Sequence, residues 1–184
     1  MNIILKHHDQ ESQRRIDHAI EFATKKHEGQ IRKYTGEPYI THPITVAYIV
    51  SLYTDDANMI IAAIMHDTQE DCEVTNDEIK QLFGNDVAYL VDGLTHVDGG
   101  SNRASRKEKT NAKLASFDDR VKTIKIIDNL HNLGSVMKYD PKFAITYVKE
   151  ARVMSEHLVG GNVKLHNKLR QVLTTATVKL NIYA

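Results

Sequence analysis

Apolar residues recur along most of the chain at intervals of three and four, which is the spacing of one face of an α-helix. The first such stretch covers residues 12–28 and is followed by Gly29, where a helix would end. Only three prolines and nine glycines break the pattern. The sequence therefore predicts an all-α fold, built as one helical bundle.

Capping residues set the expected helix boundaries. We expect a helix from Pro43 to about Leu52, one from Asp55 or Asp56 to Asp71, one from Thr75 to Phe83, one from Asn85 to about Thr95, one from Asp118 or Asp119 to about Lys138, one beginning at Asp140-Pro141, and one from about Asn162 to Val178. Residues 97–109, VDGGSNRASRKEK, are polar and basic, which predicts a mobile loop.

Length and composition suit one soluble domain spanning residues 1–184. Lys+Arg and Asp+Glu both number 24, so no net charge attracts the chain to nucleic acid or to a membrane. The longest apolar run is too short to span a bilayer, and no signal peptide is recognisable. Cys72 is the only cysteine, which fits a reducing cytoplasm. A small-molecule partner is expected, and the sequence leaves the oligomeric state open.

Four ionisable residues end the apolar run Met59–Met65 abruptly. His66-Asp67 comes first, and Glu70-Asp71 follows one turn later. Buried carboxylates need a partner charge or a metal ion. On a helix, His66 and Asp67 lie about 100° apart and can both reach one ion. From spacing alone, a metal site and a hydrogen-bonded cluster at a helix C-terminus explain the His66-Asp67 pair equally well.

Two further residues favour the metal site. His42 stands at an expected helix start, and Asp128 interrupts the apolar face of IKIIDNL. An unpaired carboxylate on such a face would be costly. Imidazoles and carboxylates together suit Mn²⁺, Fe²⁺ or Zn²⁺ better than Ca²⁺.

The connector after Gly29 carries two adjacent cations, Arg32 and Lys33, near Tyr39. Arginine binds phosphate oxygens in a bidentate manner, so this segment is a candidate phosphate cradle. The alternative is a solvated loop, which the residues of the connector alone would favour.

Three strings carry a resemblance to a known family: HEGQIRKYTGEPYITHPITVA, MHDTQEDCEVTNDEIKQLFGNDVAYLVDGLTH and IKIIDNLHNL. They resemble the metal-dependent hydrolase domain of the RelA/SpoT homologue family, within the wider HD-domain superfamily, over residues 19–139. Members remove the 3′-pyrophosphate of the alarmones ppGpp and pppGpp, giving GDP or GTP. The chain stops where larger members continue into a synthetase domain, so it is similar to the stand-alone small alarmone hydrolases.

The resemblance implies roles for individual residues. Metal ligands fall on His42, His66, Asp67 and Asp128, and one divalent ion is implied, Mn²⁺ first, with other transition metals possible. The catalytic acidic pair falls on Glu70 and Asp71, with the roles of acid and base left open. Substrate-binding positions fall on Arg32, Lys33, Asn132, Ser135 and Tyr139, the last two in the base pocket.

The chain also departs from the family. Asn129 stands where relatives usually have Arg or Lys, and Cys72 stands where Thr is common. His96 stands where the family has Lys, and Tyr34-Thr35 takes the place of a single serine in many relatives. These differences leave open the preference for ppGpp or pppGpp and the choice of base. Two alternatives remain: an HD-type phosphohydrolase acting on an adenine alarmone or on the 2′-phosphate of NADPH, and a module that binds alarmone without cleaving it. The Glu70-Asp71 pair argues against the non-catalytic module.

Overall fold

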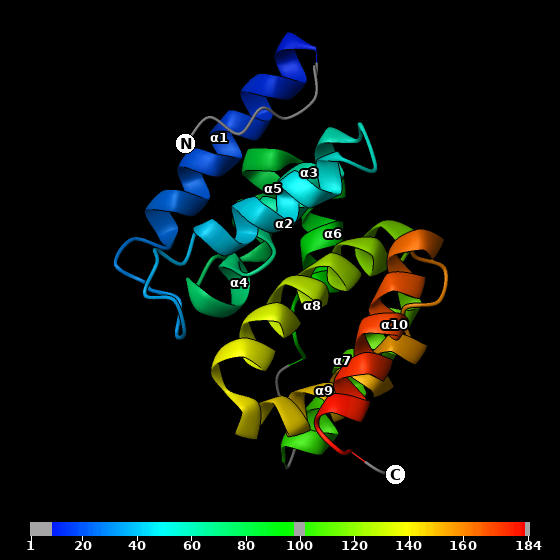
Figure 1. Cartoon of the computed structure of the whole chain (residues 1–184). Coiled ribbons are helices and arrows are strands. Elements are labelled where there is room, and N and C mark those ends of the chain that lie inside the picture. Colours follow the sequence, from blue (N-terminus) through cyan, green and yellow to red (C-terminus); the bar gives the residue numbers. More distant parts are fainter. Residues whose placement is uncertain (1–8, 98–101, 183–184) are drawn as a thin grey trace. The chain divides into compact units, whose positions relative to one another are not determined.

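A computed structural model describes residues 9–97 and 102–182 of the chain (Figure 1). Within these residues the regular structure is helical, apart from one isolated antiparallel bridge between Ile31 and Pro38. The predicted all-α fold is confirmed. The chain divides after Thr95 into two compact units, called unit 1 (residues 1–95) and unit 2 (residues 96–184). One domain across residues 1–184 stays a prediction.

Unit 1 is built around a central apolar helix. Its helices are α1 (Gln10–Lys26), α2 (Thr41–Ser51), α3 (Ala57–Met65), α4 (Thr68–Asp71), α5 (Asn76–Phe83) and α6 (Asn85–Leu94). Helix α3 contacts α1, α2 and α6, and every side chain from Met59 to Met65 is buried. A helix that is apolar all round is stable only when it is enclosed. The residues that follow α3 therefore start from the interior of the unit.

Unit 2 is built around its longest helix. It contains α7 (Arg103–Ser116), α8 (Asp119–Tyr139), α9 (Pro141–Glu156) and α10 (Val163–Lys179). Helix α8 contacts the other three, and α9 also contacts α10. The predicted caps are present: the side chains of Asp118, Asp140 and Asn162 accept backbone N–H groups at the starts of α8, α9 and α10.

Two helix predictions around the site need correction. The helix expected to run from Asp56 to Asp71 is interrupted at His66 and Asp67, which separate α3 from α4. The α2 helix begins at Thr41, two residues before the expected Pro43. The interruption is the more important difference, because it replaces the assumed helical relation between His66 and Asp67 with a turn.

The loop prediction for residues 97–109 is wrong over Arg103–Lys109, which belong to α7. The Asn102 side chain caps this helix by accepting the Ser105 N–H at 3.0 Å. Thr110, Asn111 and Leu114 are its buried residues, so the basic run occupies the exposed part of a half-buried helix. The composition of residues 103–109 did not predict this helix, because the buried residues that anchor it come after the basic run. Residues 98–101 of the predicted loop lie outside the described residues.

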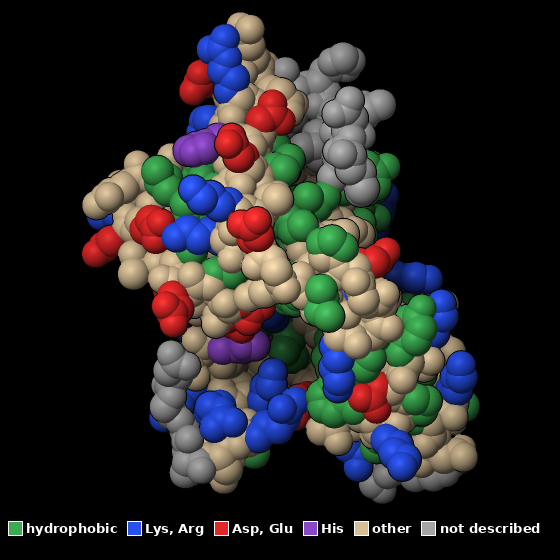
Figure 2. Space-filling view, turned by 90° about the vertical axis from the view of Figure 1, so that its left-hand side faces the viewer, with side chains coloured by type: hydrophobic (Ala, Val, Ile, Leu, Met, Phe, Trp, Pro, Cys, Tyr) green, Lys and Arg blue, Asp and Glu red, His purple; other side chains and the backbone are tan. Residues whose placement is uncertain are grey.

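Charge is unevenly divided between the units. Residues 1–95 contain 16 acidic and 8 basic side chains, whereas residues 96–184 contain 8 acidic and 16 basic ones. Figure 2 shows basic side chains gathered over the helices at the bottom of its view. The zero net charge thus conceals an acidic unit 1 and a basic unit 2. Among the described residues, no helix combines the length and apolar character needed to cross a membrane.

Candidate metal centre and active site

The turn between α3 and α4 is stabilised by side chains that bind the last carbonyls of α3. Thr68 Oγ1 donates to the Met65 carbonyl at 2.7 Å, and the His66 ring meets the Ala63 carbonyl with Nδ1 at 2.8 Å. Helix ends leave such carbonyls without helical partners, and these contacts satisfy them inside the protein. The chain can therefore turn at His66-Asp67 while still buried.

The same contact fixes which nitrogen of His66 carries hydrogen. A carbonyl oxygen only accepts, so Nδ1 must be the protonated nitrogen. Nε2 of the neutral ring then presents a lone pair. It lies 3.1 Å from Asp67 Oδ2, and His42 Nε2 lies 3.6 Å from the same oxygen. The two histidine ring centroids are 5.1 Å apart, and both side chains are about 1% exposed.

This arrangement fits a divalent cation. A lone pair and a carboxylate oxygen repel each other at such distances unless a proton or a cation lies between them. Protonating a deeply buried imidazole is itself costly. A transition metal ion would accept electrons from both rings and the carboxylate at once, and this donor set suits Mn²⁺, Fe²⁺ or Zn²⁺. His42, His66 and Asp67 thus form a candidate metal centre within unit 1.

Tyr39 joins this cluster from the connector before α2. Its hydroxyl donates to Asp67 Oδ2 at 2.8 Å. Its ring lies 5.0 Å from the His27 ring and 6.0 Å from the His42 ring, in an edge arrangement with the latter. Sequence reasoning placed Tyr39 beside the candidate phosphate cradle and missed its contact with a proposed metal ligand.

The acidic pair lies on the single turn of α4. Desolvation and then the negative charge of Asp67 raise the pKa of Asp71, with a smaller contribution from Glu70, while a hydrogen bond from Tyr39 opposes the rise. Glu70 is exposed. Asp71 therefore holds a proton more readily than an ordinary aspartate, which suits a group that exchanges protons with substrate or water.

Cys72 follows the pair and contacts His27, with Sγ 3.2 Å from Nδ1. Desolvation, followed by the negative charges of Asp71 and Asp67, raises the pKa of the Cys72 thiol to about 11. The thiol is therefore protonated near neutral pH and is a poor nucleophile. The resemblance predicts a Thr at this position, and Cys72 provides an unreactive side chain there instead.

Residues 30–39 form a loop whose ends are fastened to α4. The backbone pairs Arg32 N–H with the Glu37 carbonyl at 2.8 Å and Tyr39 N–H with the Gln30 carbonyl at 2.9 Å. Gln30 Nε2 donates to the Asp71 carbonyl at 3.0 Å. Together with the Tyr39–Asp67 hydrogen bond, this contact holds the loop against α4.

The two cations of the predicted phosphate cradle lie in this loop. The Arg32 guanidinium carbon is 5.8 Å from the centre of the Tyr39 ring, and Lys33 Nζ is 4.9 Å from the centre of the Tyr34 ring. Arg32 is partly buried and Lys33 is exposed. Both cations are thus supported by tyrosine rings, in contacts that are favourable through the ring quadrupole.

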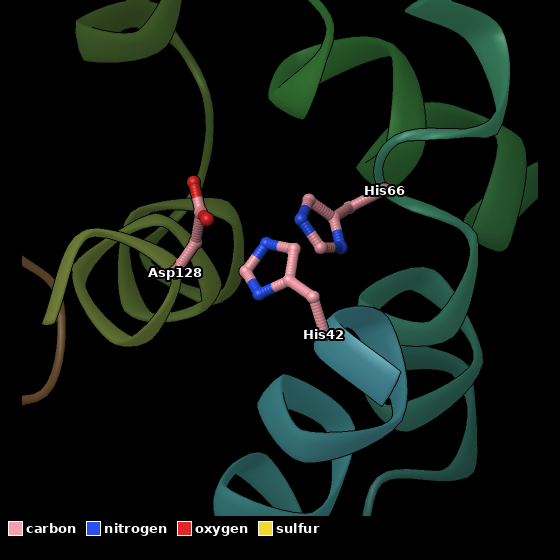
Figure 3. Close-up of side chains that lie close together, drawn as sticks. All are labelled: His42, His66 and Asp128. Carbon is pink, nitrogen blue, oxygen red and sulfur yellow. The ribbon is translucent and has the colours of Figure 1, made fainter. Parts of the chain in front are cut away.

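Asp128 lies in unit 2, on the buried side of α8. Its Oδ2 is 2.9 Å from Lys125 Nζ, and its Oδ1 accepts from Asn132 Nδ2 at 2.7 Å. Figure 3 draws its carboxylate together with the imidazoles of His42, on α2, and His66. All three are buried side chains of a metal-ligating kind. Sequence reasoning did not assign a role to Lys125, although its place one turn before Asp128 was a signal.

The other predicted substrate residues of α8 follow Asp128 along one side of the helix. Asn132, Ser135 and Tyr139 come four, seven and eleven residues later, which is close to a whole number of turns in each case. Asn132 is engaged with Asp128, Ser135 is partly buried and Tyr139 is 46% exposed. Their contact with a nucleotide stays a prediction.

The Asn129 side chain does not contact Asp128, so a cation at this position would not lie in the place that Lys125 takes beside the Asp128 carboxylate. The Asn129 amide donates to the Lys125 carbonyl at 3.0 Å and lies 3.2 Å from Met154 Sδ, and its Oδ1 accepts from the Tyr147 hydroxyl at 3.4 Å. The residue therefore belongs to the packing of α8 against α9. The buried positive charge beside Asp128 comes from Lys125 instead.

These features accord with one class of protein. The HD-domain family matches residues 19–153, which is most of the chain and includes residues of both units. The chain belongs to the HD-domain family. Its relatives include proteins named as alarmone hydrolases and others named as GTP pyrophosphokinases.

Two relatives illustrate this branch. The chain is 34% identical to the guanosine-3′,5′-bis(diphosphate) 3′-pyrophosphohydrolase MESH1 of Danio rerio, over 88% of this chain and 93% of that protein. It is 42% identical to a guanosine-3′,5′-bis(diphosphate) 3′-pyrophosphohydrolase of Aquifex aeolicus over 72% of this chain. Among solved structures, a metazoan SpoT orthologue described as hydrolysing ppGpp superimposes with a TM-score of 0.81, at 27% identity, over 92% of this chain and 97% of that one.

Many relatives are much longer than this chain. The chain spans 18% of a probable GTP pyrophosphokinase of Mycobacterium leprae and 19% of the Aquifex aeolicus protein. The similarity to these long proteins concerns one portion of each. The comparison with MESH1, in contrast, extends over nearly the whole length of both proteins.

Proposed function

We propose that the protein is a metal-dependent hydrolase that removes the 3′-pyrophosphate of guanosine alarmones, converting ppGpp to GDP and pppGpp to GTP. The observation that carries this proposal is the convergence of His42 Nε2 and His66 Nε2 on Asp67 Oδ2, one turn before the acidic pair Glu70 and Asp71. The similarity to MESH1 over nearly its full length supports the choice of substrate.

The ion is held by His42, His66 and Asp67, with Asp128 as a further ligand. Support for Asp128 comes from its burial, its ligand type and its place in the IKIIDNLHNL string. Mn²⁺ is the ion of first choice because of the resemblance to the RelA/SpoT homologue hydrolases, while the imidazole and carboxylate donors suit Mn²⁺, Fe²⁺ and Zn²⁺ alike. When bound, such an ion lowers the pKa of water and polarises a phosphoryl oxygen.

The remaining residues act on protons and phosphate charge. Glu70 and Asp71 position a water molecule whose oxygen forms a bond to the phosphorus next to the ribose. As the bond from that phosphorus to the ribose 3′ oxygen breaks, the pair takes a proton from the water and delivers one to the 3′ oxygen. Two neighbouring carboxylates share their titration, so the roles belong to the pair. Arg32 and Lys33 neutralise phosphate charge.

The nucleoside is held by Asn132, Ser135 and Tyr139, with Arg32 available to stack on the base. A hydroxyl that reads the guanine edge would disfavour adenine, because a mismatched edge leaves polar groups unpaired. Guanine alarmones are therefore the proposed substrates. The proposed partner is a small soluble nucleotide, and a cytoplasmic location is proposed for the protein.

Pyrophosphate release tests the proposal directly. Protein stripped of metal by chelator and resupplied with Mn²⁺ should release pyrophosphate from ppGpp, and the chelated protein should not. Parallel reactions with pppGpp, the adenine analogue and NADPH determine base and substrate choice. Equal or faster turnover of the adenine analogue or NADPH would overturn the guanine assignment. Tight ppGpp binding with no turnover of any of these substrates would identify a non-catalytic binding module.

A further inference from the structure

Tyr39 lies beside the residues of unit 1 that are proposed to bind the metal ion, to transfer protons and to bind phosphate. Its hydroxyl donates to Asp67 Oδ2 at 2.8 Å and lowers the pKa of the neighbouring Asp71 carboxyl, against the net rise caused by burial. Its ring supports the Arg32 guanidinium at 5.8 Å and meets the edge of the His42 ring. One side chain thus touches proposed residues for the metal, for proton transfer and for phosphate.

The backbone of Tyr39 is equally constrained. Its N–H donates to the Gln30 carbonyl at 2.9 Å, which closes the loop that carries Arg32, and its carbonyl accepts the His42 N–H at 2.9 Å in the turn that leads into α2. The residue therefore has little freedom to move relative to either segment. A rigidly held donor can orient the group to which it donates.

Donation by Tyr39 is compatible with metal binding by Asp67. A carboxylate has two oxygens and about four lone-pair sites, so one hydrogen bond leaves lone pairs for an ion. The bond also restricts rotation of a carboxylate that is only partly buried, with 16% of its side chain exposed. Partners that orient metal ligands typically affect metal affinity or activity by about 10- to 100-fold.

We propose that Tyr39 is a positioning residue that fixes Asp67 for metal binding through its hydroxyl and fixes Arg32 for substrate binding through its ring. This inference rests on the proposed function for its substrate part, and its metal part depends only on the site geometry. The two parts make different predictions, because the hydroxyl and the ring can be removed separately.

Tyr39→Phe removes the hydroxyl and keeps the ring. Calorimetric titration of chelator-stripped protein with Mn²⁺ should give a dissociation constant about 10- to 100-fold higher than that of the wild type. In an Asp67→Ala background, Tyr39→Phe should cause no further loss of Mn²⁺ affinity, because the oxygen that accepts from the Tyr39 hydroxyl is already gone. Tyr53→Phe, an exposed tyrosine of the same unit, is the matched control and should bind Mn²⁺ as the wild type does.

Tyr39→Leu removes the ring as well. With saturating Mn²⁺, Tyr39→Phe should keep the KM for ppGpp within about twofold of the wild type, whereas Tyr39→Leu should raise it further, toward the value of Arg32→Ala. Circular dichroism of the metal-free variants establishes that both are folded. If Tyr39→Leu does not fold, the Mn²⁺ titration of Tyr39→Phe still decides the metal part.

The outcomes separate this inference from the proposed function. Equal Mn²⁺ affinities for the wild type and Tyr39→Phe would overturn the positioning role, whatever the enzyme cleaves. A wild-type protein that binds Mn²⁺ but leaves ppGpp intact would overturn the proposed function alone. An unchanged KM in Tyr39→Leu would overturn the part that concerns Arg32.

Discussion

Lys125 and Asp128 form a buried ion pair on successive turns of α8, with Nζ 2.9 Å from Oδ2 and both side chains less than a tenth exposed. A buried carboxylate is tolerated when a partner charge and hydrogen bonds compensate for its lost hydration. Lys125 supplies the charge and Asn132 supplies a hydrogen bond. The pair explains how α8 can keep the Asp128 carboxylate, a proposed metal ligand, within a packed helix.

Lys125→Met should destabilise the metal-free protein by about 3–5 kcal/mol, because it leaves the Asp128 carboxylate buried without its counter-charge. Chemical unfolding in the presence of chelator measures this free energy. The double substitution Lys125→Met with Asp128→Leu should regain most of the loss, since no uncompensated charge remains. A single variant as stable as the wild type would mean that the pair contributes little.

Asp128→Asn should abolish tight Mn²⁺ binding and ppGpp turnover together, because it removes the negative charge of a proposed ligand with little change in shape. Elemental analysis of the purified protein and pyrophosphate release measure the two effects. Asp119→Asn, on the same helix but with 70% of its side chain exposed, is the control and should retain both. Full metal content and full rate in Asp128→Asn would remove Asp128 from the metal centre.

Glu70→Gln should lower kcat for ppGpp by about 10²-fold or more while Mn²⁺ affinity is kept, because its proposed work is proton transfer. Steady-state kinetics at saturating Mn²⁺ and a Mn²⁺ titration separate these quantities. Glu73→Gln, three residues later and exposed, is the matched control. Loss of metal from Glu70→Gln would instead place Glu70 among the ligands.

Cys72 should react slowly with iodoacetamide near neutral pH, because the pKa of its thiol is raised to about 11 by desolvation and by the carboxylates of Asp71 and Asp67. In chelator, the alkylation rate should rise with pH toward a midpoint near 11, whereas the urea-unfolded chain should show a midpoint near 9.0. Cys72 is the only cysteine, so every labelled thiol reports this site.

The raised pKa of the Cys72 thiol also determines whether the free energy of unfolding rises or falls with pH. The folded state holds the Cys72 proton more tightly than the unfolded state does, so this contribution to stability is present below pH 9.0 and is lost as the pH rises through about 11. Cys72→Ala should weaken the loss of stability over that range. An alkylation midpoint near 9.0 in the folded protein would contradict the assigned surroundings of the thiol.

The fold class and most helices followed from local information. Helix spacing of apolar residues and the caps at Asp56, Thr75, Asp118 and Asn162 were readable, because both depend on neighbours within a few residues. The candidate ligands were readable for a similar reason: buried carboxylates and imidazoles are conspicuous in apolar strings. The helical course of Arg103–Lys109 was not readable from its own composition, because its buried residues come afterwards.

What only the tertiary structure decided concerns contacts between distant segments. Tyr39 and Asp67 are 28 residues apart in sequence, and no local pattern links a tyrosine in a connector to a carboxylate beyond α3. The turn at His66-Asp67 likewise depends on side chains finding the last carbonyls of α3 inside a packed interior. Sequence determined which chemistry the chain carries, because residue type and helical period are local. Tertiary packing decided which groups orient one another, because that depends on distances the chain acquires only when it folds.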